Sequence, residues 1–279
     1  MAKQKSACDS CTSKSENCEQ DCEKKSMISV RDDVKSVIAV MSGKGGVGKS
    51  TVSALLASAM AKNGHKVGIL DADITGPSIP RLLGLKSGSV RNSEKGMIPP
   101  QTSMGIKVMS INLLLEREDE AVIWRGPILA SAIKQFWEEV DWGELDYLFV
   151  DLPPGTGDVP LTVLQTLPLD GVVIVFSPQD LAIMIVKKAV RMANMMEVPI
   201  IGLVENMAYL ECPDCGEVIY PYGKPKGEQV SAEIGIPVLA TLPIQPDYTT
   251  FGGQGKLEML ETTELAQLIA LLENSGDMH

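Results

Sequence analysis

The stretch Gly43-Lys44-Gly45-Gly46-Val47-Gly48-Lys49-Ser50 decides the fold, because it fits the phosphate-binding pattern G-x-x-x-x-G-K-S/T. An apolar run at residues 37–41 predicts a buried strand before it, and Ala and Leu at helical spacing predict a helix at residues 51–63 after it. The glycines let backbone N–H groups close around phosphate oxygens at the N-terminus of that helix. Lys49 can reach the β and γ phosphates, and the Ser50 hydroxyl can hold Mg²⁺. The sequence therefore predicts a site for ATP or GTP.

Strand-like and helix-like runs alternate from residue 34 onward. The predicted strands lie at residues 37–41, 67–71, 106–111, 147–151, 172–176, 200–204 and 238–242. The predicted helices lie at residues 51–63, 127–139, 181–196, 226–234 and 262–272, and we expect a long surface loop at residues 84–105. Many strands are apolar on both faces, which indicates a mostly parallel sheet covered by helices on both sides. We predict a doubly wound α/β fold in one domain, residues 34–279.

The composition and net charge of the chain argue against several classes of protein. The chain has 279 residues, of which 44% are hydrophobic, so it can bury one large core. Its net charge of −11 argues against a nucleic-acid or an anionic membrane surface as the main partner. No apolar run approaches the roughly 20 residues that span a bilayer, and the polar start of the chain is unlike a signal peptide. We expect a cytoplasmic protein.

Acidic residues stand at the ends of two predicted strands. Asp71 and Asp73 end one strand, and Asp151 ends another. In doubly wound sheets, ligands bind at the carboxyl ends of the strands, so these carboxylates are candidates for the nucleotide site. Either Asp71 or Asp73 could instead cap the segment that follows it.

The string from Lys44 to Ser50, with a lysine directly after the first glycine, resembles the deviant phosphate loop of the MinD, ParA, ArsA and nitrogenase iron protein superfamily. The resemblance implies a nucleotide-dependent homodimer in which Lys44 reaches the nucleotide of the partner. It also implies that the residues from Gly43 to Thr51 contact the nucleotide. The alternative is that Lys44 is an exposed loop charge.

Two further motifs resemble elements of the same superfamily. For Leu70-Asp71-Ala72-Asp73-Ile74, the resemblance implies that Asp73 helps to place the attacking water. Val150-Asp151-Leu152-Pro153-Pro154-Gly155-Thr156-Gly157-Asp158 resembles the switch element. This implies that Asp151 binds Mg²⁺ through water and that the N–H of Gly155 meets the γ-phosphate, so that loss of this phosphate releases the loop. A simple Pro-Gly turn would explain the bend but not the aspartate at the strand end.

Two residues later in the chain are candidates for reading the base. Asn206 follows the predicted strand 200–204 and matches the position at which these ATPases read adenine with an amide, which offers both a donor and an acceptor. Residues 243–249 resemble the loop that lies over the base, and Asp247 is the candidate there. Both matches to base-reading positions of the superfamily favour ATP over GTP as the nucleotide.

The cysteines fall into two groups. In a chain expected to be cytoplasmic, clustered C-x-x-C spacing indicates metal or redox chemistry rather than disulfides. The six residues are Cys8, Cys11, Cys18 and Cys22 in a polar tail at residues 1–33, and Cys212 with Cys215 far downstream.

The segment from Glu205-Asn206-Met207 to Cys212-x-x-Cys215 resembles the Mrp/ApbC branch of the superfamily, as do residues 71–78, 124–127 and 151–158. That branch comprises ATPases that carry iron–sulfur clusters and deliver them to apo-proteins. Because four thiolates hold such a cluster and one C-x-x-C supplies two, the resemblance implies a [4Fe-4S] cluster bridging a homodimer through Cys212 and Cys215. The alternatives for this pair are a zinc site at the dimer interface and a thioredoxin-like redox pair.

The tail cysteines have the spacing C-x2-C-x6-C-x3-C. Eukaryotic relatives of the branch carry a four-cysteine N-terminal cluster, but with a longer first gap and a different order. The tail therefore has three interpretations: its own cluster, a zinc ion, or a disordered segment with incidental cysteines. Metal binding would supply folding energy that its composition lacks.

Together, these features predict a homodimeric ATPase of the Mrp/ApbC type that binds an iron–sulfur cluster and transfers it to apo-proteins. We expect slow hydrolysis of Mg²⁺-ATP, with Lys44, Lys49 and Asp73 as the catalytic residues. One rival is a spatial regulator like MinD or ParA, which a basic C-terminal helix or a DNA-facing patch would favour. The other is an electron donor resembling the nitrogenase iron protein, which would keep its cluster.

Overall fold

The computed structural model describes residues 31–73, 76, 78–115, 126–179 and 181–276. The chain divides into two compact units, residues 1–30 and residues 31–279, and the described residues all belong to the second. Almost all of the predicted tail lies outside them, including Cys8, Cys11, Cys18 and Cys22. Metal binding by these four cysteines stays a prediction.

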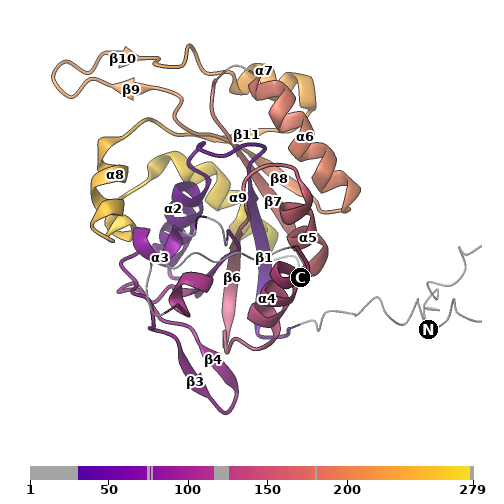
Figure 1. The fold of residues 1–279 in the computed structure, drawn as a ribbon. Coiled ribbons are helices and arrows are strands. Elements are labelled where there is room, and N and C mark those ends of the chain that lie inside the picture. The colour runs from indigo at the N-terminus through magenta and orange to yellow at the C-terminus, as the bar shows by residue number, and fades with distance from the viewer. Residues whose placement is uncertain (1–30, 74–75, 77, 116–125, 180, 277–279) are drawn as a thin grey trace, which may run out of the picture. The chain divides into compact units, whose positions relative to one another are not determined.

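A seven-stranded sheet forms the centre of the unit (Figure 1), with the strand order β11-β8-β7-β1-β6-β2-β5. Every pairing in it is parallel. The strands are β1 Val34–Met41, β2 Val67–Asp71, β5 Lys107–Ser110, β6 Leu145–Asp151, β7 Gly171–Phe176, β8 Ile200–Glu205 and β11 Val238–Thr241. All seven lie where the apolar runs predict them, which confirms the parallel α/β fold.

Helices cover both faces of this sheet, with α2, α8 and α9 on one side and α4, α5 and α6 on the other (Figure 1). The α-helices are α2 Lys49–Lys62, α3 Ile79–Leu82, α4 Gly126–Glu138, α5 Asp158–Thr166, α6 Ala182–Met195, α7 Gly227–Ile234, α8 Pro246–Gly253 and α9 Ala266–Gly276. Short 3₁₀ helices lie at Ile111–Leu113, Leu257–Met259 and Thr263–Leu265. The arrangement confirms the doubly wound architecture. None of the described helices is long and apolar enough to cross a bilayer.

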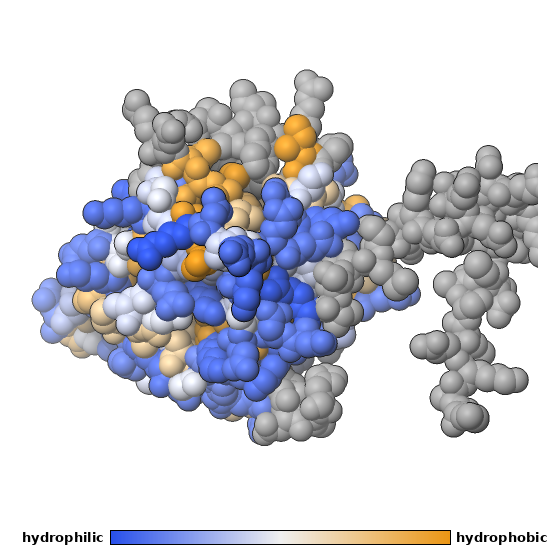
Figure 2. Space-filling view, turned by 90° about the horizontal axis from the view of Figure 1, so that it is seen from below, coloured by the Kyte–Doolittle hydropathy of each residue, from blue (hydrophilic) through white to orange (hydrophobic). Residues whose placement is uncertain are grey.

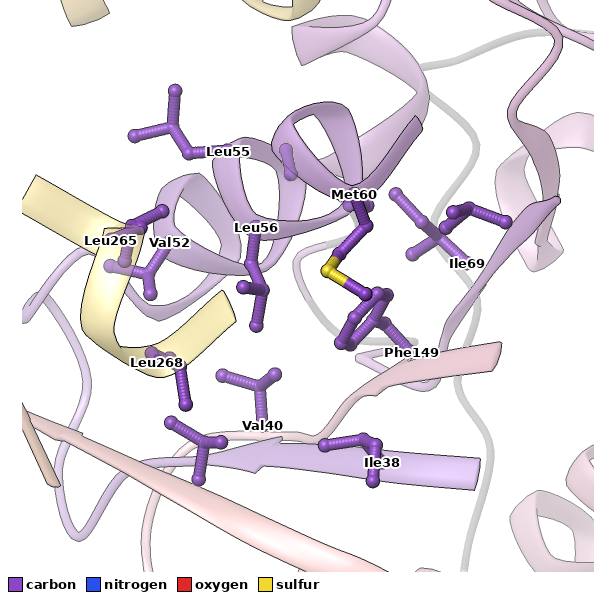
Figure 3. Close-up of a cluster of buried hydrophobic side chains, with 14 of the residues drawn as sticks. Ile38, Val40, Val52, Leu55, Leu56, Met60, Ile69, Phe149, Leu265 and Leu268 are labelled. Carbon is purple, nitrogen blue, oxygen red and sulfur yellow. The ribbon is translucent and has the colours of Figure 1, made fainter. Parts of the chain in front are cut away.

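The largest part of the core lies between α2 and the sheet, as Figure 3 shows. Its buried side chains come from α2, three strands and the C-terminal helices: Ile38, Val40, Val52, Leu55, Leu56, Met60, Ile69, Phe149, Leu265 and Leu268. Burial of such a side chain contributes about 1.5–3 kcal/mol. Because apolar residues hold α2 on several sides, its first turn is fixed at the carboxyl edge of the sheet.

The structure corrects the prediction of one long surface loop at residues 84–105. Within this segment, β3 Arg91–Ser93 and β4 Gly96–Ile98 pair as an antiparallel hairpin. Three-residue strands with mainly polar or exposed side chains carry no apolar alternation, so the sequence gives no signal for them. Figure 2 views the molecule from this lower end, where hydrophilic side chains cover most of the described surface.

Candidate functional site

The phosphate loop, residues 43–50, joins the end of β1 to the start of α2. Gly46 and Gly48 both have φ of 77°, a left-handed conformation that favours glycine. Gly48 is also crowded, since a Cβ there would lie 2.2 Å from the Nδ2 of Asn206. The loop therefore leads into the free N–H groups of a long, buried helix, an arrangement that suits a phosphate group.

A cluster of polar side chains, buried except for the half-buried Ser50, lies at this loop and the start of α2. The Nζ of Lys49 is 2.8 Å from Oδ2 of Asp151, and the hydroxyls of Ser50 and Ser53 donate to the same carboxylate at 2.5 Å and 2.6 Å. The Lys49 side chain is 6% exposed and that of Asp151 is fully buried. Asp151 reaches the loop because β6 pairs with β1, with Asp151 in register with Val40. A carboxylate and hydroxyls are ligands that Mg²⁺ prefers, and the ammonium suits a phosphate.

Asp71 ends β2 in register with Asp151. Its carboxylate accepts hydrogen bonds from the N–H of Asp73 at 3.1 Å and from the N–H of Ile79 at 3.3 Å. Burial raises the pKa of Asp71 well above its usual range, and the nearby Asp151 carboxylate adds to this rise. These contacts support the interpretation of Asp71 as a residue that holds the following segment.

Asp73 is also buried, and its Oδ1 accepts the N–H of Gly76 at 3.2 Å. It lies two residues after the end of β2, at the carboxyl edge where β1 and β6 also end. The structure thus brings the predicted catalytic carboxylate to the edge of the sheet that carries Lys49 and Asp151. Its part in hydrolysis stays a prediction.

Two groups that are predicted to contact a nucleotide, Lys44 that of the partner subunit and the N–H of Gly155 the γ-phosphate, have hydrogen-bond partners within the chain. The Nζ of Lys44 donates to Oε1 of Gln179, a residue that follows β7. The N–H of Gly155 donates to the carbonyl of Ser42 at 2.9 Å. Both groups would have to exchange these partners to meet a nucleotide.

A cavity of about 490 Å³ opens beside the loop and is large enough for a nucleoside. The residues that line it include Gly48, Thr51, Arg81, Asn206, Tyr222 and Tyr248. The Nδ2 of Asn206 donates to the carbonyl of Val47 at 2.8 Å, so this amide links the phosphate loop to the cavity. Asp247 lies exposed in the first turn of α8 and does not line this cavity.

Cys212 and Cys215 occupy the turn of a small antiparallel hairpin, β9 Leu210–Glu211 and β10 Val218–Ile219, which projects from the body (Figure 1). The Cys215 side chain is exposed and that of Cys212 is half-buried. The N–H groups of Asp214 and Cys215 lower the pKa of the Cys212 thiol, and the Cys215 thiol adds to this effect. Among the described residues, no third Cys, His, Asp or Glu joins them in a group able to hold a metal. Within the described part of the chain, the pair therefore offers two thiols and no further metal ligand beside them.

Several large side chains that follow this turn in the chain are exposed. Val218 and Ile219 are each 45% exposed, Tyr220 is 42% exposed and Tyr222 is 43% exposed. Exposed apolar side chains that gather in one place mark contact surfaces. The hairpin therefore combines two accessible thiols with a surface suited to a protein partner.

Sequence reasoning missed four residues of this region: Ser53, Arg81, Gln179 and Tyr222. Ser53 was recognisable, since it lies one helical turn after Ser50 and so faces the same way. Gln179 follows the carboxyl end of β7, where the rule for ligand sites in such sheets applies. Arg81 and Tyr222 lie on segments without a repeating pattern, and the sequence gives no signal for them.

Comparison with known proteins places these features in one family. The family model described as ParA, NUBPL iron-transfer P-loop NTPase, matches residues 33–274. An iron-sulfur cluster carrier protein of Clostridium perfringens is 49% identical over 233 residues, which are 81% of this chain and 82% of that protein. A cytosolic Fe-S cluster assembly factor NUBP2 homolog of Culex quinquefasciatus is 44% identical over 245 residues, which are 86% of this chain and 95% of that protein.

Solved structures agree with the fold. A nucleotide-binding protein from Archaeoglobus fulgidus in complex with ADP is 47% identical, with a TM-score of 0.77 over 85% of this chain and 93% of that one. A chain of the MinC:MinD cell division complex of Aquifex aeolicus is 20% identical, with a TM-score of 0.61 over 88% of this chain and 97% of that one. The second likeness concerns the fold alone.

Proposed function

This chain belongs to the ParA family of NUBPL-type iron-transfer P-loop NTPases, and we propose that it is an ATP-dependent carrier that binds an iron–sulfur cluster and delivers it to apo-proteins. The observation that carries this proposal is the hairpin with Cys212 and Cys215, which presents two accessible thiols on the same chain segment whose Met207 and Tyr222 line the cavity. The relatives described as cluster carriers and as a cytosolic assembly factor support it. We propose the cytosol as its compartment.

The cargo is a [4Fe-4S] cluster held between two copies of the chain. Iron–sulfur clusters of this type take four thiolates, and Cys212 and Cys215 supply two from each subunit. The exposed apolar side chains around the hairpin, such as Val218 and Ile219, would be covered when two hairpins meet. A cluster bound at an exposed turn can be reached by an acceptor protein, which a carrier requires.

The nucleotide part of the proposal rests on the polar cluster at the phosphate loop. Lys49 would bind the β and γ phosphates, and Ser50 with Asp151 would hold Mg²⁺, because their oxygens suit this hard cation. Asp73 would orient the attacking water, and Lys44 would leave Gln179 to reach the nucleotide of the partner subunit. Such catalysis depends on positioning and charge neutralisation, and we propose that it is slow in this chain.

The base would occupy the cavity beside Asn206, whose amide offers donor and acceptor groups to adenine. Gly155 would transmit hydrolysis, since its N–H cannot serve both the Ser42 carbonyl and a γ-phosphate. Release of the phosphate would return this N–H to Ser42. Asp247 is exposed and outside the cavity, so any contact with the base would need α8 to move.

The experiment that tests the cargo is anaerobic reconstitution with iron and sulfide, followed by iron and acid-labile sulfide analysis and native mass. We compare the wild type with Cys212→Ser/Cys215→Ser. Loss of about two iron atoms per subunit, half of a four-iron cluster, together with loss of the cluster-bearing dimer, would support a bridging cluster. Unchanged iron and sulfide would contradict it.

A matched control separates the two groups of cysteines. The variant in which Cys8, Cys11, Cys18 and Cys22 are all changed to Ser should keep the bridging cluster, and any iron that it loses belongs to the tail. Delivery is then tested with an apo-enzyme that needs a four-iron cluster for activity. Gain of activity with loss of the donor's absorbance supports a carrier, whereas reversible reduction with the cluster retained supports an electron donor.

A further inference from the structure

Residues 206–226 connect the end of β8 to the start of α7. We call this segment the cysteine arm. The buried Glu205 holds both of its ends, because it directly precedes the arm and accepts the N–H groups of Lys226 at 2.7 Å and Gly227 at 2.9 Å. The two ends of this long segment therefore lie close together and are held in place by one side chain.

Two parts of the arm form walls of the nucleotide cavity. Met207, near its start, and Tyr222, near its end, both line the cavity of about 490 Å³. The hairpin with Cys212 and Cys215 lies between them in the sequence. The cavity and the thiols thus share one continuous segment of chain, although neither cysteine lines the cavity.

The two limbs of the arm are held unequally. On the outgoing limb, Ala208 donates to the carbonyl of Leu242 at 2.9 Å, and the carbonyl of Tyr209 accepts the N–H of Ile244 at 2.6 Å. These bonds tie this limb to the segment after β11. The returning limb, residues 218–225, is exposed throughout. The returning limb is thus the one that a ligand in the cavity can reposition, and Tyr222 is its contact with the cavity.

The hairpin connects this limb to the thiols. Val218 and Ile219 pair with Glu211 and Leu210, and the N–H of Cys212 donates to the carbonyl of Glu217 at 2.9 Å. A displacement of the returning limb therefore moves the turn that carries both cysteines.

From this geometry we propose that Tyr222 is a positioning residue that couples the nucleotide to the cysteines. The ring of Tyr222 contacts the nucleoside of the bound nucleotide, and this contact restrains the returning limb and so sets the exposure of Cys212 and Cys215. The proposal rests on the proposed nucleotide binding but not on iron–sulfur chemistry. Because coupling between two binding sites is reciprocal, occupation of the thiols must change the affinity for nucleotide by the same factor.

The test measures alkylation of Cys212 and Cys215 in the reduced, metal-free full chain with N-ethylmaleimide, resolved by peptide mass spectrometry, with and without saturating ADP. ADP is used because the contact lies within one chain and needs no γ-phosphate. In the wild type we expect ADP to slow alkylation about fivefold, the low end of usual coupling between sites. In Tyr222→Ala, at its own saturating ADP concentration, we expect the slowing to disappear, and Tyr222→Phe should restore it.

Tyr220→Ala is the matched control, since Tyr220 is equally exposed on the same limb but does not line the cavity. It should keep the slowing. Slowing that survives in Tyr222→Ala, or that is lost in Tyr220→Ala, would overturn the proposal.

A second measurement does not depend on Tyr222→Ala binding ADP. Tyr222→Trp should change its fluorescence on ADP addition more strongly than Tyr220→Trp, because only position 222 lines the cavity, and equal responses would overturn the contact. Failure of the carrier function is distinguishable, because it would appear as unchanged iron in Cys212→Ser/Cys215→Ser while ADP still slowed alkylation. Failure of the coupling alone would leave the cluster in place and the alkylation rate insensitive to Tyr222.

Discussion

Replacement of Asp151 by asparagine tests the polar cluster beside the phosphate loop. The substitution keeps the size of the side chain but removes the charge that faces Lys49 at 2.8 Å. It also replaces one oxygen that accepts the hydroxyls of Ser50 or Ser53 by an NH₂ group, which cannot accept. Lys49 is then left almost fully buried without its anion.

The structure sets the expected magnitude. Breaking a buried ion pair by removing one partner costs about 3–5 kcal/mol, because the remaining charge stays desolvated. One effect opposes this loss, since the Asp151 carboxylate raises the pKa of the buried Asp71 and its removal relieves that repulsion. We therefore expect the free energy of unfolding to fall by about 3 kcal/mol, at the low end of this range.

Urea unfolding at neutral pH without nucleotide, followed by circular dichroism, measures this change. Glu144→Gln is the matched control, because Lys66 and Glu144 form an equally short pair at 2.6 Å with side chains 61% and 83% exposed. Exposed pairs contribute little, so this variant should unfold like the wild type. If Asp151→Asn also unfolds like the wild type, the pair does not stabilise the nucleotide-free protein and the electrostatic interpretation is wrong.

Three further predictions follow from the same region. Gly48→Ala should lower the free energy of unfolding in urea more than Gly46→Ala does. Both residues have φ of 77°, which costs about 1–2 kcal/mol for a residue with a side chain, but only at Gly48 would the added Cβ collide with Asn206. Equal losses of stability in the two variants would contradict this prediction. The lowered pKa of the Cys212 thiol predicts a half-maximal alkylation rate at a pH below the ordinary thiol value of 9.0, and a midpoint at or above it would refute the effect of the turn. Burial raises the pKa of Glu205 above 4.5, so its contribution to stability is present below that pH and is lost as the pH rises through the raised pKa. The free energy of unfolding of the wild type, relative to Glu205→Gln, should therefore decline over that range, and a flat difference would contradict the shift.

The sheet could be predicted because its strands are buried on both faces. All six residues of β7 are buried, and such continuous apolar runs stand out in a sequence. The short strands and α8 could not be predicted from the sequence, for the opposite reason. The strands of the cysteine hairpin have two residues each, and their side chains are exposed except for the half-buried Leu210. Helix α8 begins at Pro246 in a segment that resembles a loop in the sequence. Their form depends on tertiary contacts that no local pattern records.

The sequence could identify several individual residues of the site, but it could not show which of them contact one another. Motif resemblance singled out Lys49, Asp151 and Asn206, yet it could not show that Lys49 contacts a residue 102 positions away. That contact follows from the strand order, in which β6 lies beside β1. Tyr222 shows the limit more clearly, because no feature of its sequence neighbourhood links it to the phosphate loop. The roles assigned to these residues stay predictions until they are tested.

The position of Asn206 adds a second possible link to the proposed coupling between the nucleotide and the thiols. Parallel strands end at one common edge, so the residue after β8 lies against the phosphate loop, and its amide donates to the carbonyl of Val47. The same residue begins the cysteine arm, while Glu205 just before it is fixed in the sheet and in the N-terminus of α7. A change at the loop therefore acts on the root of the arm directly. Under our proposal Tyr222 would add a second contact from the returning limb, and the nucleotide would then meet the arm at both of its ends.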